Sequence, residues 1–333
     1  MTTPPGGPLL AAPGAAVGRS GRVALAIRGM SALPVLTIVA AIVLLWYAAA
    51  VPMNIHGALD EAQRAGVAVR PETPVERREV GAFALTVRNP AVVRATWELD
   101  RPRLPAPHQV AVELWNTVAG EEVSSRRSIV YHAWITLSAT LLGFAMGTAL
   151  GVLLAVGIVH SRAMDMSVMP WAIASQTIPI LAIAPMIIVV LNSIGMTGVV
   201  PKALISAYLS FFPVVVGMVT GLRAPDAMQL ALLRTYGASR AETFWKLRLP
   251  ASLPFLFTSL KVAAAASLVG AIVGELPTGA QAGLGARLLA GSYYGQTVQI
   301  WAALFGAAIL AALLVGGIGA VQRAVLGRMG FGR

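Results

Sequence analysis

Long apolar runs separated by polar segments of very different lengths dominate this chain. The runs lie at about 33–51, 133–159, 166–191, 203–222, 252–273 and 298–321. Each is close to or above the ~20 residues that an α-helix needs to cross ~30 Å of hydrocarbon. Because a helix satisfies its own backbone hydrogen bonds inside lipid, the pattern predicts an all-α membrane protein with six transmembrane helices.

The second run contains a regular series of small residues. Gly143, Gly147 and Gly151 recur every four positions and therefore line one face of the helix. Such a series lets a second helix approach closely. We interpret these glycines as packing residues.

The third run is interrupted by polar residues and prolines. Gln176 and Thr177 are followed by Pro179 and Pro185. Prolines free backbone carbonyls at bilayer depth, which a neighbouring helix or a water-filled cavity must satisfy. These four residues, with Glu275 after the fifth run, are candidates for a translocation pathway. A kinked packing helix with a satisfied glutamine, and a plain interfacial cap at Glu275, are the alternatives.

The segment between the first and second runs is polar, and its basic and acidic residues are equal in number. Six prolines from Pro71 to Pro107 interrupt it, and the alternation of apolar and polar residues in 83–88 and 92–97 suggests short strands. It is too interrupted for an enzymatic domain, so we expect an extracytoplasmic insertion that ends in a surface helix. The Gly-rich stretch 277–296, with Gly279, Gly283 and Gly285, is expected to be re-entrant or to lie on the surface.

Charge distribution predicts the topology. The chain is 57% hydrophobic and 12% charged, with a formal net charge of +11. Because the insertion is neutral, the excess of basic residues lies beside the ends of the apolar runs. This distribution is the positive-inside pattern of membrane proteins and not that of a nucleic-acid-binding face. We expect a multi-pass protein of the bacterial inner (plasma) membrane with both termini in the cytoplasm. A cleaved signal peptide at residues 33–51 is the alternative, but its apolar core is longer than such cores usually are.

The expected organisation follows from these boundaries. It comprises a disordered cytoplasmic tail (1–30), transmembrane helix 1 (31–51), the insertion and surface helix (52–128), a core with five transmembrane helices (129–326) containing a cytoplasmic loop (223–250), and a C-terminal tail (327–333).

The loop between the fourth and fifth runs is too structured for a plain connector. Gly237 can adopt the left-handed angles that close a helix. Ser239 is then an N-cap, with Glu242 three residues later forming a capping box. An apolar side follows, and Pro250 is expected to end the new helix. We interpret the loop as a docking element for a soluble partner, an ordinary interfacial loop being the alternative.

The loop resembles a known motif. Gly237, nine residues, Leu247, one residue and Leu249-Pro250 match the second half of the EAA loop of ABC importer permeases. The family's Glu-Ala-Ala is replaced by Ala231-Leu232-Leu233, so its acidic contact is missing. Leu104-Pro-Ala-Pro107 and Gln176-Thr-Ile-Pro179 are similar to segments of the nitrate/sulfonate/taurine/pyrimidine group of type I permeases.

This resemblance implies a function and a set of partners. The fold would be the MetI-like permease core, working as a homodimer with cytoplasmic ABC ATPase subunits and an extracytoplasmic substrate-binding protein. ATPase docking would fall on Gly237, Ala238, Ser239, Arg240, Glu242, Phe244, Leu247, Leu249 and Pro250.

The sequence contains no pattern for catalysis. It has no cysteine, no P-loop and no histidine spacing suited to a metal. We therefore expect a non-enzymatic transport subunit without a cofactor, with ATP and Mg bound by the partner ATPase. A secondary carrier or channel is the alternative, but carriers usually place ionisable residues within the membrane, and this chain nearly lacks them.

Overall fold

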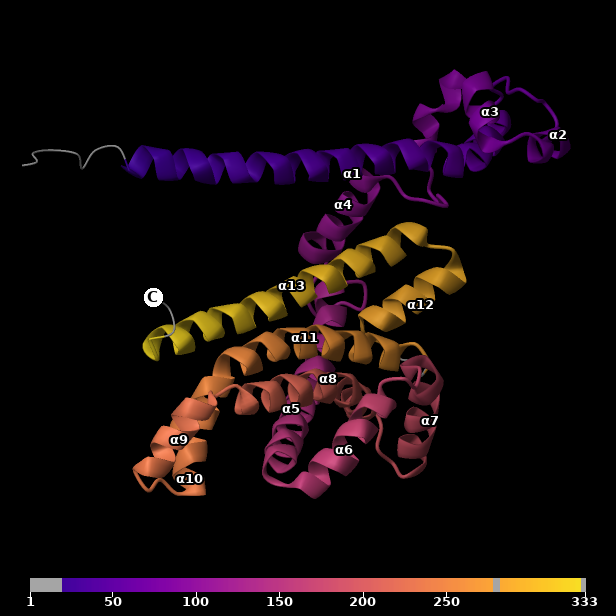
Figure 1. Cartoon of the computed structure of the whole chain (residues 1–333). Coiled ribbons are helices and arrows are strands. Elements are labelled where there is room, and N and C mark those ends of the chain that lie inside the picture. Colours follow the sequence, from indigo (N-terminus) through magenta and orange to yellow (C-terminus); the bar gives the residue numbers. More distant parts are fainter. Residues whose placement is uncertain (1–19, 278–281, 331–333) are drawn as a thin grey trace, which may run out of the picture. The chain divides into compact units, whose positions relative to one another are not determined.

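A computed structural model describes residues 20–277 and 282–330 (Figure 1). Every regular element in these residues is a helix. The chain divides into two compact units, one ending at Trp97 and the other beginning at Glu98. Residues 1–19 of the expected tail, Gly279 and residues 331–333 lie outside the described part. Helix α1 begins at Ser20, within the tail that is expected from the sequence to be disordered.

The first unit is built on α1 (Ser20–Arg64), which continues past Pro52 instead of ending at residue 51. Short helices α2 (Pro74–Glu79), α3 (Ala82–Arg88), η1 (Pro90–Val92) and η2 (Arg94–Trp97) follow it. Ile55, Leu59 and Leu85 are completely buried in this unit. Asn54 donates a hydrogen bond to the Thr96 carbonyl at 3.0 Å, which fixes η2 against α1.

The two strands suggested within this unit are wrong. Residues 82–88 form α3, and residues 92–97 belong to two 3₁₀ turns. Gly81 provides the N-cap of α3, and Pro90 occupies the first turn of η1, where its missing N–H costs nothing. In α3 the apolar alternation buries only Leu85 and leaves Phe83 76% exposed.

The second unit contains the remaining helices. They are α4 (Pro107–Trp115), η3 (Asn116–Gly120), α5 (Ile129–His160), α6 (Arg162–Ser175), α7 (Ile180–Ser193), α8 (Val199–Arg223), α9 (Ala227–Thr235), α10 (Arg240–Thr243), η4 (Phe244–Arg248), α11 (Leu249–Glu275), α12 (Leu284–Tyr294) and α13 (Thr297–Arg328). The expected surface helix, α4, therefore belongs with the core and not with the insertion, and α12 occupies most of the Gly-rich stretch 277–296.

Helix α8 is the centre of the second unit and packs along both α5 and α11. Small residues make these close contacts possible. A Cβ added at Gly143 or Gly147 would collide with the backbone of α8, and one at Gly151 would collide with Val214. The packing role predicted for the three glycines is confirmed.

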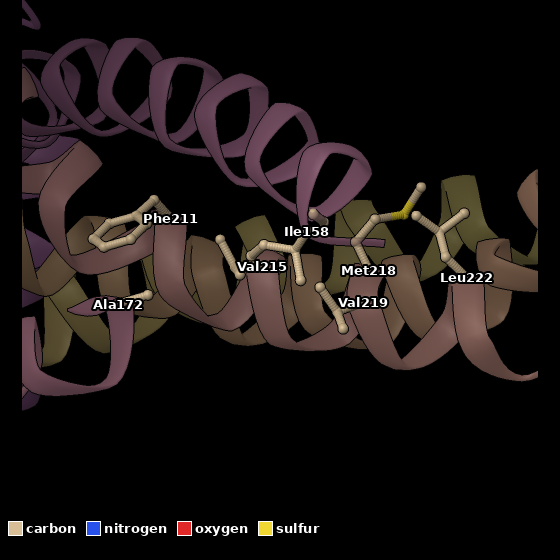
Figure 2. Close-up of a cluster of buried hydrophobic side chains, with 8 residues drawn as sticks. Ile158, Ala172, Phe211, Val215, Met218, Val219 and Leu222 are labelled. Atoms are coloured by element: carbon tan, nitrogen blue, oxygen red, sulfur yellow. The ribbon is translucent and has the colours of Figure 1, made fainter. Parts of the chain in front are cut away.

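A cluster of buried apolar side chains holds α5, α6 and α8 together (Figure 2). Phe211, Val215 and Met218 extend along α8, and Ile158 of α5 and Ala172 of α6 pack beside them. Phe244 and Leu249 pack against the same cluster from the segment that follows α10. The loop after α8 is therefore connected to the packed core.

The third apolar run is two helices and not one. Helices α6 and α7 are bent by 98° at the break between them. The described residues contain five helices long and apolar enough to cross a membrane, and this bent pair adds a sixth if it counts as one span. The proline-interrupted character of the run was predicted, but the size of the bend was not.

Candidate functional site

The loop between α8 and α11 consists of α9, α10 and η4, and α9 and α10 project beyond the ends of α8 and α11 (Figure 1). No residue of α9, α10 or η4 is buried. The predicted docking residues follow in order along this segment. Gly237, Ala238 and Ser239 form the turn, Arg240 and Glu242 lie on α10, Phe244 and Leu247 lie on η4, and Leu249 and Pro250 begin α11.

Gly237 closes α9 as predicted. Its φ is +72°, a left-handed conformation that strains any residue with a Cβ. The Ala238 N–H donates to the Leu233 carbonyl at 3.0 Å, and the Gly237 N–H donates to the Arg234 carbonyl at 2.9 Å. This pair of bonds is a Schellman motif, which satisfies the last carbonyls of α9 and fixes the angle at which α10 leaves.

The predicted capping box begins α10. The Glu242 N–H donates to the Ser239 hydroxyl oxygen at 3.2 Å, and the Ser239 N–H donates to a Glu242 carboxylate oxygen at 2.9 Å. Lys246 adds an ion pair to the other oxygen of Glu242 at 3.0 Å. The turn between α9 and α10 is therefore fixed by hydrogen bonds on both sides.

The sequence predicted that Pro250 would end the helix, and this prediction is wrong. Pro250 instead lies in the first turn of α11. The five residues before Leu249 form a π turn, in which the Leu249 N–H donates to the Phe244 carbonyl. A proline lacks an N–H and clashes with the carbonyl four residues earlier, and the wider π turn relieves that clash. Helix α10 consequently continues through η4 into α11.

The loop contacts the core on one side and is exposed on the other. Phe244 packs edge to face on His160 of α5, with ring centroids 5.3 Å apart. Arg248 donates to the Leu222 carbonyl at the end of α8, at 3.4 Å. Tyr236 and Trp245, in contrast, are 80% and 66% exposed. Tyr236 was missed from sequence, although an aromatic residue beside the closing glycine was a usable signal.

The pathway candidates Gln176, Thr177 and Pro179 lie at the bend between α6 and α7, and Pro185 lies within α7. The Tyr208 hydroxyl of α8 donates to the carbonyl of Ser175, four residues before Pro179. A neighbouring helix therefore satisfies a carbonyl that the proline cannot. Within the part of the chain described, the Gln176 side-chain nitrogen is buried without a hydrogen-bond partner. Whether Gln176 lines a pathway stays a prediction.

Glu275 is completely buried, so its interpretation as a plain interfacial cap is wrong. Its carboxylate accepts hydrogen bonds from the Thr136 hydroxyl at 3.0 Å and from the Gly285 N–H at 2.8 Å. Lys202 Nζ lies 3.7 Å from the same carboxylate and donates to the Ala282 carbonyl at 3.3 Å. These contacts connect α5, α8 and α11 to the start of α12.

His132 completes this polar cluster by accepting a hydrogen bond from the Gly283 N–H at 3.0 Å. The sequence argument missed His132, Thr136 and Lys202. Lys202 gave the clearest signal, because it is a single charge beside a long uncharged stretch. The cluster explains the glycines, since a Cβ at Gly283 or Gly285 would collide with Glu275.

Several helices long and apolar enough to cross a membrane, with a capped, exposed loop between two of them, are typical of a polytopic membrane protein. Residues 147–330 match the family model described as the binding-protein-dependent transport system inner membrane component. The chain belongs to this family and is a multi-pass inner membrane protein, the permease subunit of an ABC importer.

Curated relatives agree with the family match. The chain is 30% identical over 183 residues to the formylaminopyrimidine transport permease protein of Halalkalibacterium halodurans, covering 55% of this chain and 68% of the relative. It is 29% identical to the riboflavin transport system permease protein of Chloroflexus aurantiacus, covering 66% and 78%. It is 25% identical to the taurine transport system permease protein of Escherichia coli, covering 69% and 82%.

Proposed function

We propose that this permease subunit is driven by a separate ATPase that docks on the loop from Gly237 to Pro250. The observation that carries the proposal is the doubly capped turn at Gly237 and Ser239, which presents exposed Tyr236 and Trp245. A plain connector has no need of such fixed geometry. ATP and Mg would bind to the ATPase, and this chain would supply the membrane pathway.

The geometry also supports a route for coupling. Helix α10 continues through η4 into α11, and α11 packs along α8. A displacement of the docked loop would therefore move α11 as a rigid element. Phe244 and Leu249 would carry the same displacement into the cluster around Phe211 and Val215. The pathway would then open alternately to the two sides of the membrane.

We further propose the assembly of two copies of this chain with two ATPase subunits and an extracytoplasmic binding protein. The family match supports such partners in general terms. The arginines beside the loop and near the C-terminus support a cytoplasmic position for the loop and for the C-terminus. In the described residues the buried Gln176 nitrogen without a partner supports a pathway at the bend between α6 and α7.

The cargo would be a small polar solute delivered by the binding protein. The names of the relatives include a formylaminopyrimidine, riboflavin and taurine. The two nitrogen heterocycles come from relatives with higher identity than the sulfonate, so heterocyclic solutes are the first to test.

Substitution of Gly237 by valine tests the docking assignment. The change places a β-branched residue at φ +72° and costs about 1–2 kcal/mol in the turn. Since an added Cβ would meet no atom within 4 Å, the effect would come from the backbone alone. We expect the cognate ATPase to co-purify poorly with Gly237→Val while the chain still inserts in the membrane.

Gly66→Val is the matched control, because Gly66 also has a positive φ (+79°) and open surroundings but lies outside the loop. It should bear the same strain and retain the ATPase. Normal ATPase binding by Gly237→Val would refute the docking assignment. Solute uptake by the chain without ATP would instead favour a secondary carrier or channel.

A further inference from the structure

A basic cavity of about 550 Å³ lies between the end of α5 and the α9–α10 turn. Its charged lining consists of Arg234, Arg240 and Arg248, and His160 completes one side. No acidic residue is among the side chains that line it. Three guanidinium groups around one cavity repel each other unless an anion occupies the space between them.

The arginines of this cavity have no carboxylate partners. Among residues 20–277 and 282–330, no carboxylate lies within ion-pair distance of any of the three. The nearby acids are committed elsewhere, since Glu242 pairs with Lys246 and Asp165 pairs with Arg223 at 2.9 Å. Arg248 uses one N–H on the Leu222 carbonyl, which leaves the rest of its five donors available.

The backbone holds the three arginines in fixed positions. Arg234 lies in the last turn of α9, where its carbonyl accepts the Gly237 N–H. Arg240 is the first residue of α10, directly after the capping box at Ser239. Arg248 is the last residue of η4 and is tied to the end of α8. The turn and the end of α8 therefore fix the backbone positions from which the three cationic side chains reach the cavity.

The position of the cavity indicates the source of the anion. The apolar span of α5 ends at His160, and the apolar part of α11 begins a few residues after Arg248. The cavity therefore lies at the level where the spans leave the hydrocarbon, which is the level of lipid headgroups. Arginine forks match the oxygens of a phosphate group, and basic pockets beside spans bind anionic headgroups.

We propose that this cavity binds the phosphate group of an anionic phospholipid. The lipid would neutralise the three arginines and hold the α9–α10 turn against the end of α5. Because Phe244 of the same segment packs on His160, lipid occupancy would stabilise the position from which the loop docks. This effect on docking rests on the function proposed above, whereas the binding itself does not.

The test measures lipid binding by the purified, delipidated full chain without any ATPase. Native mass spectrometry would compare phosphatidylglycerol, phosphatidylcholine and inorganic phosphate as probes. We expect phosphatidylglycerol to bind, and Arg234→Gln/Arg240→Gln to weaken that binding by about tenfold or more. Arg234→Lys/Arg240→Lys should lose less phosphatidylglycerol binding, because lysine keeps the positive charge but lacks the paired donors of the guanidinium group.

The matched control is Arg323→Gln/Arg328→Gln on α13, which removes equal charge from another helix and should leave binding unchanged. The proposal would be overturned if the two double variants lost phosphatidylglycerol binding equally. It would also be overturned if the wild-type chain bound phosphatidylcholine as well as phosphatidylglycerol. Tight binding of inorganic phosphate alone would overturn the assignment to a lipid. If the glutamine pair instead loses a cognate ATPase while phosphatidylglycerol binding is unchanged, the cavity takes an acidic protein surface, and the proposed docking function still stands.

Discussion

The carboxylate of Glu275 joins elements that are far apart in the chain. It meets Lys202 of α8, Thr136 of α5 and the Gly285 N–H of α12 within one buried cluster. A buried charge of this kind is tolerated only while its partners remain in place. We therefore interpret Glu275 first as an anchor for the start of α12, and its role in the pathway stays a prediction.

Loss of the Glu275 side chain should destabilise the protein strongly. Glu275→Ala leaves Lys202 buried without its counter-ion and the Gly285 N–H without an acceptor. The expected cost is about 3 kcal/mol or more, visible as a lower thermal midpoint in detergent.

Removal of both charges provides the control for that variant. Lys202→Met/Glu275→Gln should be milder than Glu275→Ala, because no unpaired charge remains buried. A double variant as unstable as the single one would show that packing, and not the charge pair, dominates at this position.

At the scale of elements, small residues allow α5 and α8 to pack closely. The added Cβ of Gly147→Ala would collide with the Ala207 carbonyl and the Ser210 hydroxyl. Helices cannot move apart there without losing the contacts above and below. We expect Gly147→Ala to lower the thermal midpoint by an amount equivalent to about 1–3 kcal/mol.

Gly316→Ala on α13 is the matched comparison, because an added Cβ there meets no atom within 4 Å. Alanine is favoured over glycine in a helix by about 1 kcal/mol, so this variant should be neutral or stabilising. Equal behaviour of the two variants would contradict the close packing of α5 on α8.

Local sequence signals predicted the elements that depend on neighbours along the chain. Ser239 and Glu242 are three residues apart, and Gly237 closes its own helix, so the turn was predictable. Lys202 and Glu275 are far apart in sequence, and only the packing of α8 on α11 brings them together. The alternation around Leu85 was misleading, because a short helix buries that side chain as well as a strand does.

The same limit explains the errors at helix ends. Pro250 normally predicts a helix end, but the π turn before it removes the clash, and periodicity does not predict a π turn. The prolines in the apolar run from Met166 to Leu191 predicted an interrupted helix but not a bend of 98°. At that bend the Tyr208 hydroxyl of α8 donates to the Ser175 carbonyl, a contact between residues far apart in the sequence.

At the scale of the whole molecule, the chain is the permease subunit of an ABC importer, a family that implies an ATPase partner in general terms. The proposed link is the turn at Gly237 and Ser239, which continues through η4 into α11. The anchors around Glu275 and the glycine contacts of α5 would keep the helices rigid enough to transmit a displacement.

ATP-driven solute uptake into proteoliposomes, measured for the wild-type complex and for Ser239→Ala/Glu242→Ala, tests this link most directly. The variant removes both side chains of the capping box and leaves the membrane helices unchanged. The account predicts ATP-dependent uptake by the wild type, and a parallel loss of uptake and of ATPase association in the variant. Full uptake and normal ATPase association in the variant, or wild-type uptake that does not depend on ATP, would contradict it.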